Sequence, residues 1–206
     1  MKIVIVSGSP KGQGSASEKI AAALQSRLAP AADCAALHAA KHNREEIMAA
    51  LAGCGALILV FPLYVDGIPS HLLRLLDETR SAIADAAPGL TVYCVVNNGF
   101  FEARQNALAL ELTRNFCDSS GLKWGQGLGV GAGGMIHAAR VGHGPMKNLG
   151  KALDALAENI LRGQTGEDRF AEPNFPKFLY NMIAHMSWRS QARKHGLKAG
   201  ELRRGL

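Results

Sequence analysis

The chain has 206 residues, of which 48% are hydrophobic and 19% are charged, a composition typical of a single globular α/β domain. No apolar stretch approaches the ~20 residues that a membrane span requires, so we expect no transmembrane segment. Met1 directly precedes a predicted strand and leaves no room for a signal peptide, which predicts a cytoplasmic protein.

The net charge is +6, and much of the positive excess lies near the carboxyl terminus. Nucleic acid or an anionic membrane surface therefore has to be considered as a partner. Trp188 is the only aromatic residue nearby that could stack on a base, so we favour a solvated basic helix and tail and expect no nucleic acid. The basic residues concerned are Arg189, Arg193, Lys194, Lys198, Arg203 and Arg204.

The cysteines are scattered through mostly apolar sequence, and none forms a CxxC pair. We therefore expect buried free thiols rather than disulfides, and no metal site is predicted. The residues concerned are Cys34, Cys54, Cys94 and Cys117.

The first predicted element is a buried strand from Ile3 to Val6, followed by a Ser/Gly loop and a helix that Ser15 or Ser17 can cap. Such a loop gathers backbone N–H groups, hydroxyls and a helix N-terminus around one point, and Lys11 adds positive charge. It lacks the Gly-Lys-Ser/Thr ending of a nucleoside-triphosphate loop and the GxGxxG spacing of a dinucleotide loop. We therefore favour a site for a terminal phosphate monoester over an ordinary turn between a strand and a helix.

The following elements alternate between strands and helices, which predicts a parallel sheet with helices on both faces. Five strands with a phosphate loop after the first favour a three-layer, flavodoxin-like α/β fold with strand order 2-1-3-4-5, in which ligands bind beyond the carboxyl ends of strands 1 and 3. Later strands are predicted at residues 33–39, 55–61, 90–96 and 123–130, and helices at 44–52, from 69 to beyond 83, 102–117 and 145–161.

The end of the chain is predicted to lie outside this domain of residues 1–162. Residues 162–176 are rich in Gly, Pro and charge and are predicted to be a linker, followed by an amphipathic helix over Lys177–Lys194. We expect this helix to dock at a homodimer interface or over a cofactor cleft. Its apolar stripe consists of Phe178, Leu179, Met182, Ile183 and Met186.

Three loops should meet at the carboxyl edge of the predicted sheet: residues 9–17, 61–69 and 97–102. The second and third loops pair an aromatic residue, Tyr64 or Phe100, with glycine and polar backbone, as the walls of a flat heteroaromatic ring require. A phosphate site at one end and ring clamps at the other describe flavin mononucleotide (FMN). Since such a cofactor carries the chemistry itself, no catalytic side chain is predicted, and a turn-capping role is favoured over a catalytic one for Asp66.

The stretches GSPKGQGSAS, PLYVDGIPS and NNGFFEA together resemble the NAD(P)H-dependent FMN reductase family of flavodoxin-like oxidoreductases, over roughly residues 1–160. The resemblance implies non-covalent FMN, hydride transfer from NAD(P)H, a small acceptor such as free flavin or a quinone, and a homodimer. A pI near 9.3 favours an enzyme over an electron-carrier flavodoxin, which stays the alternative. The cofactor-binding residues implied are Ser9, Lys11, Ser15, Ala16 and Ser17 on the phosphate loop, Pro62, Leu63, Tyr64, Val65 and Asp66 on the first ring loop, and Asn97, Asn98, Gly99 and Phe100 on the second.

A second glycine motif, Gly129 to Gly134, matches GxGxxG, and Asp154 follows at the distance of a ribose-binding acid. The next helix opens at Pro145, however, so no helix N-terminus directly follows the glycines. Close packing on one face of an outer strand therefore explains these glycines better than a dinucleotide site.

Overall fold

The computed structural model describes residues 1–39, 43–197 and 201. The chain divides into two compact units, Met1–Pro173 and Asn174–Leu206. The first unit thus extends beyond residue 162, where the sequence predicted a linker to begin. Lys198, Arg203 and Arg204 of the predicted basic tail lie outside the described residues.

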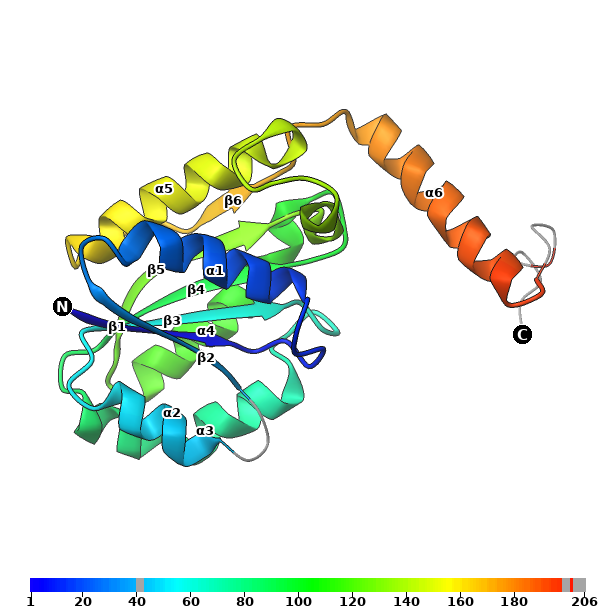
Figure 1. The fold of residues 1–206 in the computed structure, drawn as a ribbon. Helices are drawn as coiled ribbons and strands as arrows, with labels where there is room; N and C mark the ends of the chain where they lie inside the picture. Colours follow the sequence, from blue (N-terminus) through cyan, green and yellow to red (C-terminus); the bar gives the residue numbers. More distant parts are fainter. Residues whose placement is uncertain (40–42, 198–200, 202–206) are drawn as a thin grey trace. The chain divides into compact units, whose positions relative to one another are not determined.

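The first unit is built on a parallel sheet with strand order β2-β1-β3-β4-β5-β6 (Figure 1). The predicted order of the first five strands, 2-1-3-4-5, is confirmed. β1, β3 and β4 are buried over nearly their whole length, as expected for apolar strands covered on both faces. The strands are β1 (Lys2–Ser7), β2 (Asp33–His38), β3 (Ala56–Pro62), β4 (Thr91–Asn97), β5 (Lys123–Val130) and β6 (Arg169–Ala171).

Helices cover both faces of the sheet, which confirms the predicted flavodoxin-like three-layer fold (Figure 1). Leu57 and Leu59 of β3 belong to the core beneath α2, α3 and α4, whereas Ile58 and Val60 belong to the core beneath α1 and α5. The helices are α1 (Ala16–Leu28), α2 (Arg44–Leu51), α3 (Ser70–Ala86), α4 (Ala107–Ser119) and α5 (Lys147–Leu161). Short 3-10 helices are η1 (Ala103–Asn106), which precedes α4, η2 (Gly133–His137) and η3 (Gly144–Met146), which precedes α5.

The sixth strand corrects two predictions, that Lys123–Val130 is the last strand and that residues 162–176 are a linker. β6 pairs in parallel with the end of β5. The carboxylate of Asp168, just before β6, accepts hydrogen bonds from the backbone N–H of Gly127 at 2.8 Å and from Trp124 Nε1 at 3.3 Å, and it forms an ion pair with Arg114 at 2.7 Å. β6 is held by the contacts of one charged side chain and not by an apolar run, so no hydrophobic pattern in the sequence predicts this strand.

Gly129 in β5 and Gly131 directly after it are explained by close packing, although β5 is not an outer strand. A Cβ at Gly129 would lie 2.6 Å from the Phe170 ring, and one at Gly131 would lie 2.2 Å from the carbonyl oxygen of Phe101. Asp154, the candidate ribose acid, is instead paired with Arg27 at 2.6 Å. Because these glycines have no side chains, β6 and the segment leading into η1 can pack closely against them.

All four cysteines are free: Cys54, Cys94 and Cys117 are buried, and Cys34 is half-buried. The expected free thiols are confirmed. Burial raises the pKa of all four thiols, to about 12 for Cys117, so they are poor nucleophiles at neutral pH.

The second unit contains α6 (Lys177–Lys194), at the bounds that the sequence predicted. The predicted amphipathic character is wrong, because Arg189 and Arg193 lie on the same face of the helix as the apolar stripe. Among the described residues, no helix combines the length and hydropathy needed to span a bilayer.

Replacement of Gly131 tests the close approach at the end of β5. In Gly131→Ala the new methyl group meets a backbone oxygen that cannot rotate away, so the free energy of unfolding should fall by about 1–3 kcal/mol. Gly134→Ala is the matched control, because nothing lies within 4 Å of its Cβ position, and it should change stability by less than about 0.5 kcal/mol. Urea unfolding followed by circular dichroism measures both variants, and equal losses would contradict the packing explanation.

Candidate functional site

Hydrogen bonds join four loops at the carboxyl edge of the sheet. The hydroxyl of Ser17, in the first turn of α1, donates to Oδ1 of Asn97 at the end of β4, at 2.7 Å. The N–H of Leu63 donates to the carbonyl of Asn97 at 2.8 Å, and the N–H of Gly133 donates to the carbonyl of Asn98 at 2.7 Å. The loops after β1, β3 and β4 therefore meet as the topology predicts, and the loop after β5 joins them.

The loop after β1 holds its donors in a tight, polar turn. Ser9 is buried, its carbonyl accepts from the N–H of Gly12 at 3.2 Å, and its Oγ accepts from the N–H of Lys11 at 3.3 Å. Ser15 caps α1, because its Oγ accepts from the N–H of Glu18 at 3.1 Å. The carboxylate of Glu18 in turn accepts from the N–H of Gly14. An anionic oxygen thus already bonds one of the loop amides.

The residues predicted to bind the phosphate differ in the hydrogen-bond donors that they have available. Ser9 and Ser15 use their oxygens as acceptors in the bonds above, which leaves the hydroxyl protons for another acceptor. Lys11 is exposed, and Ala16 begins α1. Ser17 is only 1% exposed, and its hydroxyl proton is committed to Asn97. Ser17 and Asn97 therefore hold α1 against β4.

The first ring loop is a strained two-residue turn. Tyr64 and Gly67 exchange backbone hydrogen bonds of 3.1 and 2.9 Å, with Val65 and Asp66 at the centre of the turn. Their φ angles are +47° and +57°, a left-handed conformation that costs a β-branched residue such as valine of order 1–3 kcal/mol. Tyr64 is half exposed and Val65 is fully exposed, so no burial of Val65 within the chain offsets this strain.

The second ring loop is closed by the side chain of Asn98. Its Oδ1 accepts from the N–H of Phe100 at 3.0 Å, and its Nδ2 donates to the carbonyl of Glu102 at 3.1 Å. Asn98 is buried, whereas Phe100 is 56% exposed and Gly99 has open space around its Cβ position. The hydrogen bonds of Asn98 therefore fix the backbone of this loop, and the Phe100 ring is exposed on it.

Two histidines lie close to these loops and were not predicted as site residues. The pKa of His137, in η2, is lowered by partial burial and by the nearby Lys19 and Lys11. The pKa of His71, at the start of α3, is lowered by burial and by His38. His137 could have been found from the sequence by its position after β5, because the carboxyl end of β5 lies at the same edge of the sheet as the three predicted loops.

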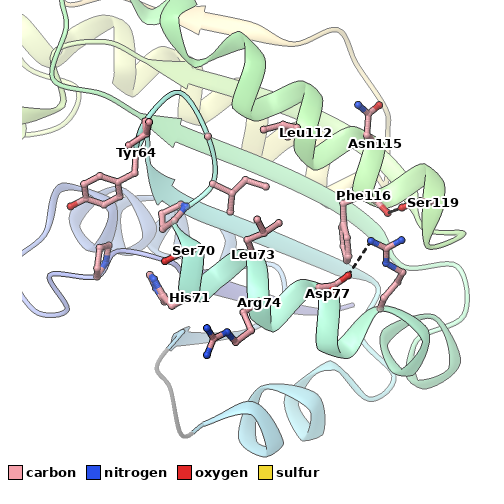
Figure 2. Close-up of a pocket in the computed structure, with 16 residues that line it drawn as sticks. Tyr64, Ser70, His71, Leu73, Arg74, Asp77, Leu112, Asn115, Phe116 and Ser119 are labelled. Carbon is pink, nitrogen blue, oxygen red and sulfur yellow. Dashed lines mark hydrogen bonds and ion pairs between the residues drawn. The ribbon is translucent and has the colours of Figure 1, made fainter.

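A groove of about 1250 Å³ runs from the Tyr64–Gly67 turn between α3 and α4. Figure 2 shows Leu73 of α3 and Leu112 and Phe116 of α4 pointing into the space between the two helices, with Arg74 and Asp77 along α3. The groove shares the first ring loop with the candidate site but contains none of residues 97–100. Pro10 of the loop after β1 also lines the groove, so the groove is a surface that adjoins the candidate site at the Tyr64–Gly67 turn and at Pro10.

Comparison with known proteins identifies the fold. No family model matches the chain, and no curated protein matches it in sequence. Solved structures do match. An NADH:FMN oxidoreductase in its apo form superposes with a TM-score of 0.57 at 17% identity, covering 80% of this chain and 90% of that one. An NADPH-quinone reductase from P. pentosaceus gives 0.57 at 16% identity, covering 78% and 98%.

A flavodoxin from Streptococcus pneumonia gives a TM-score of 0.56 at 13% identity, covering 78% of this chain and 99% of that one. The chain spans only 35% of a rubredoxin oxygen:oxidoreductase from Desulfovibrio gigas, with 78% of its own length covered, 15% identity and a TM-score of 0.57. At these identities the comparisons show a flavodoxin-like fold that both flavin-dependent reductases and flavodoxins adopt.

The strain in the first ring loop can be measured by substitution. Val65→Asn should raise the free energy of unfolding by about 1 kcal/mol, because asparagine tolerates positive φ and Val65 is fully exposed. Val65→Thr is the matched control: threonine is also β-branched, retains the strain and should leave stability unchanged. Urea unfolding measures both variants, and an equal gain in the two would show that relief of strain is not the cause.

Proposed function

We propose that this chain binds FMN and transfers hydride from NAD(P)H to a small acceptor such as free flavin or a quinone. The observation that carries the proposal is the junction of a phosphate-type loop with two aromatic loops, held together by the Ser17–Asn97 and Leu63–Asn97 hydrogen bonds. The fold places this junction at the switch point between β1 and β3, where ligands of such sheets bind.

The residues present fit an FMN phosphate at the first loop. Ser9 and Ser15 have hydroxyl protons to donate, the N-terminus of α1 favours an anion, and Lys11 supplies positive charge. The Gly14 amide already bonds the Glu18 carboxylate, so it would bond a phosphate oxygen only in place of that carboxylate. Ser17 would act indirectly, by fixing the loop against β4.

The residues present also fit a flat ring between the second and third loops. Tyr64 and Phe100 are the exposed aromatic side chains of these loops, and one of them would stack on the isoalloxazine. The N–H groups of Tyr64 and Phe100 are occupied within the protein. The amides of Val65 and Asp66 are therefore the donors that we assign to the polar edge of the ring.

When bound, FMN would accept hydride from NAD(P)H and deliver the electrons to the acceptor. The chain would contribute position: the Tyr64 and Phe100 loops frame the face on which nicotinamide must stack, with reacting atoms about 3–3.5 Å apart. A non-enzymatic electron-transfer flavodoxin is the second candidate, favoured by the likeness to the Streptococcus flavodoxin. The sequence pI near 9.3 supports the enzyme.

The function is tested on purified protein. Flavin released by denaturation should be FMN on chromatography, and anaerobic stopped-flow mixing with NADH and with NADPH should bleach the bound flavin within seconds for at least one nucleotide. FAD as the main flavin, or no binding on reconstitution, would refute the cofactor. Bound FMN that neither nucleotide bleaches within minutes would leave the electron carrier as the function.

Glu18 offers a variant that separates the phosphate loop from the ring loops. Glu18→Gln keeps an acceptor for the Gly14 amide but removes a negative charge, so FMN should bind up to about fivefold more tightly, the effect of an exposed charge pair. Once saturated with FMN, this variant should be reduced at the wild-type rate. Weaker binding by Glu18→Gln would show that the phosphate does not lie at this loop.

We further propose that the chain forms a homodimer through the groove between α3 and α4. Tyr64, Leu73 and Leu112 are 41–51% exposed and line it together, and exposed apolar side chains that gather in one groove mark a surface for interaction. Arg74 and Asp77 lie one turn apart on the α3 rim. In a two-fold arrangement with α3 antiparallel to its copy, Arg74 of each chain would lie opposite Asp77 of the other. Asp77 already pairs with Arg80 of its own chain at 3.3 Å, so the partner's arginine would join an existing ion pair.

The dimer is tested by light scattering after size exclusion. Wild-type protein should have the mass of two chains, and the double variant Leu73→Glu, Leu112→Glu should have the mass of one, because the buried charges repel across the two-fold axis. Ala22→Glu, on the exposed face of α1, is the matched control and should stay dimeric. A monomeric wild type, or a double variant that remains dimeric, would contradict this interface.

A further inference from the structure

Three basic side chains gather beside the loop after β1, and we call them the basic cluster. Lys11 lies in this loop, Lys19 lies in α1 one turn after its cap, and His137 ends η2; all three are exposed. The pKa of His137 is lowered first by partial burial and then by Lys19 and Lys11, so both lysines act on the same imidazole. An anion held among these groups would relieve their mutual repulsion.

The positive charge of the basic cluster is not paired in the part of the chain that the structure describes. Neither lysine forms an ion pair there. The carboxylate of Glu18, next to Lys19 in sequence, accepts from the N–H of Gly14. The charged groups that shift the pKa of His137 are the two lysines, without a carboxylate. The cluster therefore has cationic donors available for a ligand.

Packing fixes the position of His137 relative to the candidate site. The N–H of Gly133, which begins η2, donates to the carbonyl of Asn98 in the second ring loop at 2.7 Å. Ile136, the neighbour of His137, is buried in the core beneath α1. One end of η2 is thus held by the second ring loop and the other by α1, so the basic cluster borders both the phosphate loop and a ring loop.

The FMN phosphate proposed above does not use the whole cluster. Its donors are Ser9, Ser15, the N-terminus of α1 and Lys11. Lys19 comes four residues after Ser15, which is about 6 Å farther along the helix axis. Lys19 and His137 are therefore left to bind a second anionic group beside the first.

The second anion that the proposed reaction brings to this edge is the nicotinamide nucleotide. NAD-binding sites commonly place a carboxylate against the ribose hydroxyls, whereas NADP-binding sites place a cation where the 2′-phosphate lies. The basic cluster has cations and no carboxylate that shifts the pKa of His137. A phosphate monoester carries close to two negative charges at neutral pH, which suits two cationic donors better than a ribose hydroxyl does.

We propose that Lys19 and His137 bind the 2′-phosphate of NADPH and make NADPH, rather than NADH, the hydride donor. The loop after β5 then determines nucleotide specificity, while the ring loops position the nicotinamide. This inference rests on the proposed function, because it names the nucleotide that the reductase uses.

Binding is measured by calorimetry on the FMN-loaded full chain, without hydride transfer. Adenosine 2′,5′-bisphosphate should bind at least about tenfold more tightly than adenosine 5′-monophosphate, because only the first carries the 2′-phosphate. Its binding should weaken several-fold in about 0.5 M salt. Equal affinity for the two nucleotides, or no binding of the bisphosphate, would overturn the proposal.

Variants locate the site within the chain. Lys19→Gln with His137→Gln should weaken binding of adenosine 2′,5′-bisphosphate about tenfold and change FMN affinity by at most about threefold. Lys123→Gln is the matched control: it removes an exposed lysine at the amino end of β5, on the opposite edge of the sheet, and should change neither affinity more than about twofold. A loss of FMN affinity as large as that of the bisphosphate would assign the cluster to the FMN phosphate and refute the inference.

Stopped-flow reduction separates this inference from the proposed function. Wild-type flavin should be bleached by NADPH with a second-order rate constant at least about tenfold larger than by NADH, and the double variant should lose most of this preference. Similar rate constants for the two nucleotides in the wild type would overturn the inference and leave the reductase intact. Bleaching by neither would refute the reductase and the donor role, and the calorimetry would then decide alone whether the phosphate site exists.

Discussion

The buried hydrogen bond between Ser17 and Asn97 is the constraint on which the candidate site depends. Ser17 is 1% and Asn97 5% exposed, so either side chain left alone would be an unsatisfied buried polar group, at a cost of about 1–3 kcal/mol. The bond fixes the first turn of α1 against the end of β4. Since Leu63 donates to the carbonyl of the same Asn97, one residue sets the positions of all three predicted loops.

The sequence was sufficient to predict the fold because its strongest strands are local signals. β1, β3 and β4 are continuous apolar runs, and their alternation with helices leaves few parallel topologies. β6 could not be predicted in this way. It has three residues, and the carboxylate of Asp168 just before it is anchored by Gly127 and Trp124, some forty residues away in sequence. A single contact between residues so distant in the sequence produces no periodic pattern from which a strand could be predicted.

The loops of the site could be located from the sequence, but the roles of their residues could not. Strand ends are fixed by topology, so residues 9–17, 62–66 and 97–100 were brought to one edge. Which hydroxyl faces a ligand depends on partners distant in sequence: Ser17 is occupied by Asn97, and Ser15 caps its own helix. The sequence analysis placed Asp66 in a turn, but it did not predict the left-handed backbone of Val65 and Asp66 at the centre of that turn.

The strained turn at Val65 and Asp66 links the candidate site to the groove between α3 and α4. A valine with φ of +47° and full exposure gains nothing from its own chain that offsets the strain. Tyr64 and Val65 line the groove and are also candidates to contact a flavin ring. A ligand on one side and a second copy on the other would bias the same strained turn. Because coupling between two binding events is reciprocal, FMN that stabilises this turn would favour the dimer, and the dimer would favour FMN equally.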